Sequence, residues 1–94
     1  MDNAEMSDTA ALIAKICDDI RDLLLRKNQA YGNSALEPIR VFSKASSCEQ
    51  ILVRIDDKLN RIKQGANILT EDEDVLQDLI GYLILLKVWK ESTE

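Results

Sequence analysis

The sequence predicts an all-α fold, a small domain of four helices of which three are long and one is short. Apolar residues recur at intervals of three and four along most of the chain, and no stretch alternates apolar and polar residues as a β-strand does. One proline and three glycines are present, and they fall between the helical patterns. Serine, threonine and acidic residues stand where helices are expected to begin.

The first long helix is expected from about Ser7 to Arg26. Ser7 is a suitable N-cap, and the stretch KNQAYGNSALEP that follows the helix contains asparagines and Gly32, which favour a turn. Residues 1–6 precede the cap and are expected to be disordered. The apolar residues of this helix recur at helical spacing: Leu12, Ile13, Ile16, Ile20, Leu23 and Leu24.

The short helix is expected from Pro38 to about Ser43. Proline suits the first turn of a helix, because the N–H that it lacks has no partner there. Ile39 and Phe42 would anchor this helix through their apolar side chains.

Capping boxes predict where the other two long helices begin. Two overlapping boxes in SSCEQ place the start of the third helix near Cys48, and Gly65 suits the position just past its end. Thr70 and Glu73 form a further box that opens the last helix, which is expected to reach about Lys90. The stretch EDED in its first turn is favourable at the positive end of the helix dipole.

The length of 94 residues allows one domain, residues 1–94, without room for a second core. A domain of this size buries a limited share of its surface, so the helices are expected to complete their packing in a homodimer or homotetramer. The chain has no histidine, and its two cysteines, Cys17 and Cys48, have no motif spacing. They are expected to be buried free thiols.

The net charge is −5, from 12 basic and 17 acidic side chains. Binding of nucleic-acid polymers or anionic membranes is therefore not expected, because both need a basic stripe. The N-terminus has no signal-peptide pattern, and no apolar run approaches the length of a membrane span, about 20 residues. A cytoplasmic protein is expected.

The stretch VRIDDKLNRIKQG, residues 53–65, separates apolar from charged residues around a helix. The charged face consists of Arg54, Asp57, Lys58 and Arg61. It can be a solvated face with local ion pairs, such as Asp57 with Arg61. It can equally be one wall of a site that binds an anion through a metal ion.

The last helix carries Glu71, Asp74 and Asp78 on one face, at spacings of three and four. Asp78 lies within VLQDLIGYLILLK, and a carboxylate in such an apolar helix is costly to bury unless it is paired or binds a metal ion. With Asp57 from the neighbouring helix, these acids would form a Mg²⁺ or Mn²⁺ site. The alternatives are that Asp78 pairs with an arginine or a lysine of another helix, or that it faces open solvent.

The loop KNQAYGNS adds candidate ligand contacts. Lys27 is at the end of a helix, where a cation is favourable in any case, and Asn28 suits a turn. Tyr31 would either pack on the core or stack on a base. Phe42 and Trp89 are expected to anchor the core or an interface.

Three motifs taken in order resemble a known family. They are K-N-x-x-Y-G-N-S at residues 27–34, R-x-x-D-K-x-x-R at 54–61 and D-x-x-x-D-L-x-x-Y at 74–82. Together they resemble small phage and bacterial proteins related to the MazG-like all-α nucleoside triphosphate pyrophosphohydrolases, a branch also called nucleotide-modification-associated domains.

The resemblance implies a helical hydrolase that forms dimers or tetramers and binds a (deoxy)nucleotide with Mg²⁺. It would cleave a (d)NTP into a (d)NMP and pyrophosphate, with metal ions neutralising the phosphates and activating water. The implied metal ligands are Asp57, Asp74, Asp78 and Glu71, of which Asp57 and Asp78 are the implied catalytic residues. The implied substrate contacts are Lys27, Arg54, Lys58 and Arg61 for the phosphates, and Asn28 and Tyr31 for the sugar or base.

Two departures from the family pattern leave the enzyme assignment open. The chain lacks the E-E-x-x-E helix that supplies most metal ligands in better-studied relatives, and Ala30 stands where an acid is common. Nucleotide binding without cleavage is therefore one outcome. A different class of function is also open, a small helical interaction protein, such as a phage accessory protein, whose acidic surface binds a host protein.

Overall fold

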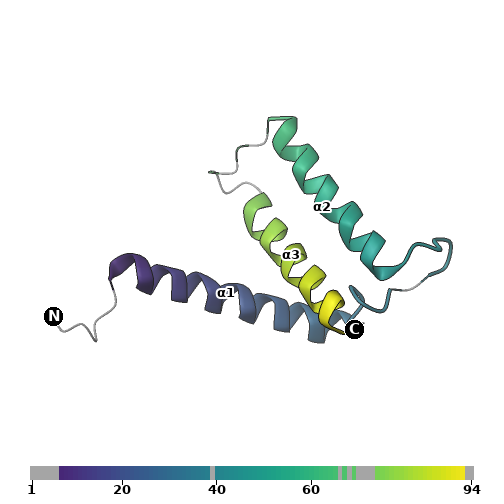
Figure 1. The fold of residues 1–94 in the computed structure, drawn as a ribbon, viewed down its shortest axis with the longest axis horizontal. Helices are drawn as coiled ribbons and strands as arrows, with labels where there is room; N and C mark the ends of the chain where they lie inside the picture. The colour runs from purple at the N-terminus through teal and green to yellow at the C-terminus, as the bar shows by residue number, and fades with distance from the viewer. Residues whose placement is uncertain (1–6, 39, 66, 68, 70–73, 93–94) are drawn as a thin grey trace.

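The computed structural model describes residues 7–38, 40–65, 67, 69 and 74–92, and these form three α-helices (Figure 1). They are α1 (Asp8–Tyr31), α2 (Ser47–Lys63) and α3 (Val75–Ser92). The described residues contain no strand, so the all-α prediction is confirmed. None of the described helices is long and apolar enough to cross a membrane. The predicted disorder of residues 1–6 and the predicted cap at Thr70 and Glu73 lie outside the described residues.

The predicted short helix is absent where the structure describes its segment, at residues 38 and 40–43. Phe42, one of its two expected anchors, is 95% exposed, and the other, Ile39, lies outside the described residues. A helix of one or two turns is unstable in water without tertiary packing. A favourable residue for a first turn, Pro38, does not supply that packing.

Local caps set the ends of α1. The Ser7 hydroxyl accepts a hydrogen bond from the Ala10 N–H at 3.0 Å, as predicted. The helix continues past Arg26 to Tyr31, because Lys27, Gln29 and Ala30 are good helix formers. Gly32 then stops it in a left-handed conformation (φ 63°) and donates its N–H to the Asn28 carbonyl.

The caps of α2 and α3 are equally local. Ser46 accepts a hydrogen bond from the Glu49 N–H at 3.1 Å, and Gly65 follows the end of α2 with a φ of 103°, both as expected. At the start of α3, a carboxylate oxygen of Asp74 accepts a hydrogen bond from the Gln77 N–H at 2.7 Å. Asp74 is therefore the N-cap of α3.

Helices α2 and α3 run antiparallel and side by side, while α1 passes across the end of this pair (Figure 1). Their small core contains Ile20 from α1, Ile51 and Ile55 from α2, and Val75 from α3. Gly81 lets α1 approach α3 closely, since a Cβ atom there would lie 3.3 Å from a terminal methyl carbon of Leu24. The N-terminal half of α1 extends beyond the other two helices (Figure 1).

The prediction that both cysteines are buried is wrong for Cys17, which is exposed, while Cys48 is half-buried. Cys17 lies in the part of α1 that extends beyond α2 and α3, so no neighbouring helix covers it. Trp89, an expected anchor, is half-buried on α3.

Replacing Asp74 tests its role as the N-cap of α3. Asp74→Ala is expected to lower the free energy of unfolding by about 1 kcal/mol, because the Gln77 N–H loses its acceptor. Asp74→Asn keeps an acceptor oxygen and is expected to unfold like the wild type in a urea titration. Equal stability of the alanine variant and the wild type would contradict the capping role.

Candidate binding cleft

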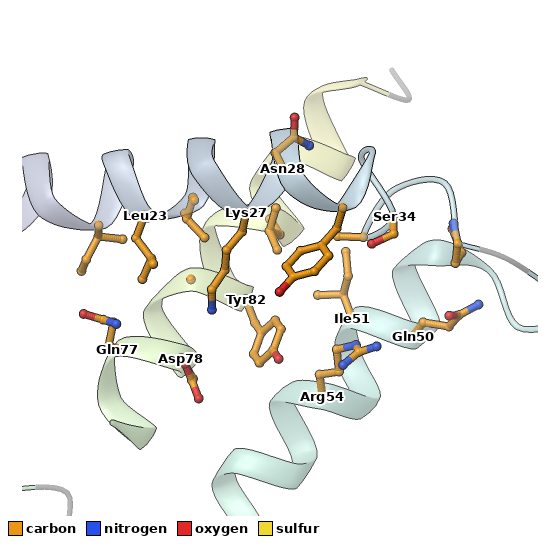
Figure 2. A pocket seen from close by; sticks show the side chains of 17 residues that line it. Leu23, Lys27, Asn28, Ser34, Gln50, Ile51, Arg54, Gln77, Asp78 and Tyr82 are labelled. Carbon is orange, nitrogen blue, oxygen red and sulfur yellow. The ribbon is translucent and has the colours of Figure 1, made fainter. Parts of the chain in front are cut away.

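A cleft of about 490 Å³ lies between the C-terminal half of α1, the first turns of α2 and the N-terminal half of α3 (Figure 2). Its volume is within the range of small-molecule sites. Apolar side chains form much of its wall, among them Leu23, Leu24, Ile51 and Leu85. The polar or charged residues that line it are Lys27, Asn28, Tyr31, Ser34, Gln50, Arg54, Gln77, Asp78 and Tyr82.

The last turns of α1 supply one polar wall of the cleft. Lys27 and Tyr31 are separated by four residues, so they lie one above the other on the helix face that carries Ile20 and Leu23 further back. The apolar stripe of α1 thus becomes polar where it borders the cleft. Figure 2 shows Lys27 extending from α1 into the same space as Tyr82 of α3.

The amide of Asn28 points away from the cleft, on the outer side of α1 (Figure 2). It donates a hydrogen bond to the side-chain oxygen of Asn33 at 2.8 Å, and Asn33 is itself in a left-handed conformation (φ 64°). The Asn28 side chain therefore stabilises the turn after α1, a role that suits asparagine and that the sequence had left open beside ligand binding.

Helix α2 contributes one positive charge to the cleft and a second to an ion pair at its wall. Arg54 lines the cleft and is exposed. One turn later, the Lys58 ammonium lies 2.9 Å from a carboxylate oxygen of Asp78, which also lines the cleft. The two side chains are only 13% and 30% exposed, so this is a partly buried ion pair between helices. The sequence had left this pairing of Asp78 with a lysine open as an alternative to a metal ion.

The four predicted metal ligands are not brought together within the described residues. Asp57 is exposed and does not line the cleft, Asp74 caps α3, and Asp78 pairs with Lys58. Glu71 lies outside the described residues. Among the residues that are described, no group of three acidic, cysteine or histidine side chains is placed to hold a metal ion. The metal site stays a prediction.

The predicted substrate contacts gather better than the predicted metal ligands. Of these six residues, Lys27, Tyr31 and Arg54 line the cleft, and Asn28 borders it with its amide pointing away. Lys58 is paired with the cleft residue Asp78, and Arg61 is exposed and outside the cleft lining. Tyr82 and Gln77 also line the cleft and were not among the predicted contacts. Tyr82 follows Asp78 by one helical turn, and this spacing was the signal that could have identified it.

A comparison of the chain with protein-family models, curated proteins and solved structures returns no significant match. The family resemblance of the three motifs therefore remains an expectation.

Breaking the ion pair between Lys58 and Asp78 tests its contribution to the fold. Lys58→Met and Asp78→Asn are each expected to lower the free energy of unfolding by about 1–3 kcal/mol, because the remaining partner stays partly buried without its counter-charge. The double variant is expected to lose less free energy of unfolding than the sum of the losses in the two single variants. Urea denaturation of the wild type, the two single variants and the double variant measures the coupling free energy between Lys58 and Asp78.

The exposed pair of Lys15 and Asp19 on α1 provides the matched control, because its atoms lie 2.7 Å apart in open solvent. Lys15→Met is expected to change the stability little. If the stability loss of the double variant equals the sum of the losses of Lys58→Met and Asp78→Asn, the ion pair does not couple α2 to α3.

Proposed function

We propose that this protein binds a nucleotide in the cleft between its three helices. The observation that supports the proposal is that Lys27 of α1 and Arg54 of α2 line one small, largely apolar cleft together with Tyr31 and Tyr82. Two cations from different helices at one cavity suit a phosphate group, and aromatic and aliphatic side chains suit a base.

The two cations would serve different parts of a phosphate chain. The planar guanidinium of Arg54 can donate two parallel hydrogen bonds to one phosphate, whereas the Lys27 ammonium acts as a point charge. Because both are exposed enough to be solvated, they cost little to keep charged before the ligand binds. A flat base would stack on one or both tyrosine rings, an interaction that every base can make.

The ion pair at the cleft wall favours an anionic ligand. An unpaired carboxylate at Asp78 would repel phosphate groups in the same cleft. Lys58 lies 2.9 Å from that carboxylate and compensates its charge, so Lys27 and Arg54 leave the site with a positive balance. A chain with a net charge of −5 can thus present a locally cationic site.

Cleavage of a (d)NTP into a (d)NMP and pyrophosphate is the further step that the family resemblance implies. It requires divalent metal ions, Mg²⁺ or Mn²⁺, held by several carboxylates. Among the described residues of a single chain, no group of three acidic, cysteine or histidine side chains is placed to hold such an ion. Pyrophosphate release therefore belongs to the proposal only if Glu71, which lies outside the described residues, or a second copy completes the ligand set.

The alternative of an acidic surface that binds a host protein has less support. Three acids of α1, Asp18, Asp19 and Asp22, lie within 4 Å of Arg21 or Lys15 on the same helix. The hydrogen bonds that Lys15 donates to Asp19 and Arg21 donates to Asp22 raise the pKa of Lys15 and Arg21, which reflects the same local compensation. The acidic face of α1 is therefore largely neutralised within the helix.

Charge removal in the cleft tests nucleotide binding directly. Lys27→Gln and Arg54→Gln are each expected to weaken the binding of a (d)NTP or (d)NMP by about 10- to 100-fold, because each removes a charge-assisted hydrogen bond. Isothermal titration calorimetry with a panel of nucleotides measures the dissociation constants.

Lys63→Gln is the control, because it removes one positive charge from the exposed end of α2 outside the cleft lining. It is expected to leave the affinity almost unchanged. An equal loss of affinity in all three variants would mean that net charge, and not the cleft, governs binding. No binding of any nucleotide by the wild type would overturn the proposal.

Pyrophosphate release in the presence of Mg²⁺ or Mn²⁺ tests the catalytic extension. Asp57→Asn is the informative variant, since Asp57 is exposed and its replacement is expected to affect the fold little. If Asp57 is a metal ligand, the variant loses pyrophosphate release while the melting temperature is preserved. Wild-type release that is unchanged in the variant would exclude Asp57 from the metal site.

A further inference from the structure

Helix α3 exposes apolar side chains on the side that faces away from α1 and α2. Its sequence, VLQDLIGYLILLKVWKES, is apolar nearly all round, and a helix of this kind is expected to be buried on all sides. Leu76, Leu83 and Val88 are nevertheless 45%, 46% and 41% exposed. Part of the α3 surface is therefore suited to a contact that the described residues do not supply.

A groove of about 530 Å³ lies along the pair of α2 and α3, at the end where α2 begins and α3 ends. Its apolar wall consists of Leu52 from α2 and Leu83, Leu86 and Trp89 from α3, with Cys48 beside them. It shares no lining residue with the cleft between the three helices. A tryptophan in an apolar hollow is a frequent anchor of protein interfaces.

The charged residues that line this groove are both basic, Lys87 and Lys90. Glu49 and Glu91 are neighbours of lining residues in the sequence, but neither lines the groove. Among the described residues, no acid lies within ion-pair distance of Lys87. The groove is thus locally basic in a chain whose net charge is −5, and such a rim is complementary to acidic side chains.

The shape of the groove favours a helix as its occupant. It follows about two turns of α3, from Leu83 to Lys90, beside the first two turns of α2. An amphipathic helix can lay its apolar face into a groove of this kind, while acids on its flanks reach the lysines. A second copy that met the groove about a twofold axis would place the same hollow opposite, which would leave both hollows unfilled.

We propose that this groove binds an amphipathic helix of a partner protein, in which acidic residues flank the apolar face. Apolar side chains of that helix contact Leu52, Leu83 and Trp89, and its acids pair with Lys87 at the rim. The partner occupies a surface separate from the cleft between the three helices. This inference is therefore independent of nucleotide binding.

The fluorescence of Trp89, the single tryptophan of the chain, tests the proposal with a synthetic peptide. The probe is an amphipathic helix of about 18 residues without tryptophan, with leucines at spacings of three and four and glutamates on both flanks. It is expected to shift the Trp89 emission saturably to shorter wavelength, because the half-buried ring becomes covered. A peptide with lysines in place of the glutamates is expected to bind at least ~10-fold more weakly.

Two variants locate the binding of the acidic peptide. Leu83→Gln is expected to weaken it by about 10-fold, and Lys87→Glu is expected to reverse the preference between the two peptides. Both side chains are exposed in the single chain, so the helicity measured by circular dichroism is expected to persist. The matched controls are Leu12→Gln on α1 and Lys63→Glu on α2, which change exposed residues outside the groove lining and are expected to bind like the wild type.

Three results would overturn the proposal. One is a Trp89 emission that does not change with the acidic peptide at concentrations up to about 1 mM. Another is equal affinity of the wild type for the acidic and the basic peptide. The third is an emission that shifts with protein concentration alone, or on vesicles of anionic phospholipid, because a second copy or a membrane would then occupy the groove.

Discussion

The crossing of α1 over α3 at Gly81 is the constraint on which the cleft depends. A glycine within a helix costs about 1 kcal/mol relative to alanine, so a helix keeps one where a neighbour needs the space. Here that neighbour is Leu24, whose terminal methyl carbon would lie 3.3 Å from a Cβ atom at residue 81. This approach holds the C-terminal half of α1 against α3 and brings Lys27 and Tyr31 to the same cavity as Asp78 and Tyr82.

The charges of the cleft follow from the packing of α2 against α3. Asp78 lies in a helix that is apolar on most sides, and its carboxylate is only 30% exposed. Lys58 of α2 compensates that charge across the helix pair, so the carboxylate is not left partly buried without a counter-charge. Arg54, one turn before Lys58, is then available to a ligand. The ion pair of Lys58 with Asp78 thus joins α2 to α3 and leaves the cleft with a net positive charge.

Local signals in the sequence predicted the parts of the fold that depend on neighbouring residues. Ser7 and Ser46 cap α1 and α2 as expected, because an N-cap needs only its own next turn. The prediction of a short helix at Pro38 was wrong, because a helix of one or two turns forms only with tertiary packing, and the exposed Phe42 side chain provides none. The burial of Cys17 was wrong for a related reason, since it assumed a neighbour for the N-terminal half of α1.

The site was predictable only in part, because its geometry depends on how helices far apart in sequence face each other. The loop motif KNQAYGNS pointed to Lys27 and Tyr31 and helical spacing pointed to Arg54, and the structure places all three at one cleft. Spacing could not choose between a metal ion and a lysine as the partner of Asp78, since that choice depends on the relative position of α2 and α3. Spacing also could not show that the Asp74 carboxylate accepts a hydrogen bond from the Gln77 N–H.

The most direct test of the central claim is a titration of the ¹⁵N-labelled protein with a deoxynucleoside triphosphate, followed by two-dimensional NMR. The account predicts that the largest shift changes fall on backbone amides around the cleft, in residues 27–31, 50–54 and 77–82. Spectra that do not change, or changes confined to the N-terminal half of α1, would contradict a nucleotide site between the three helices.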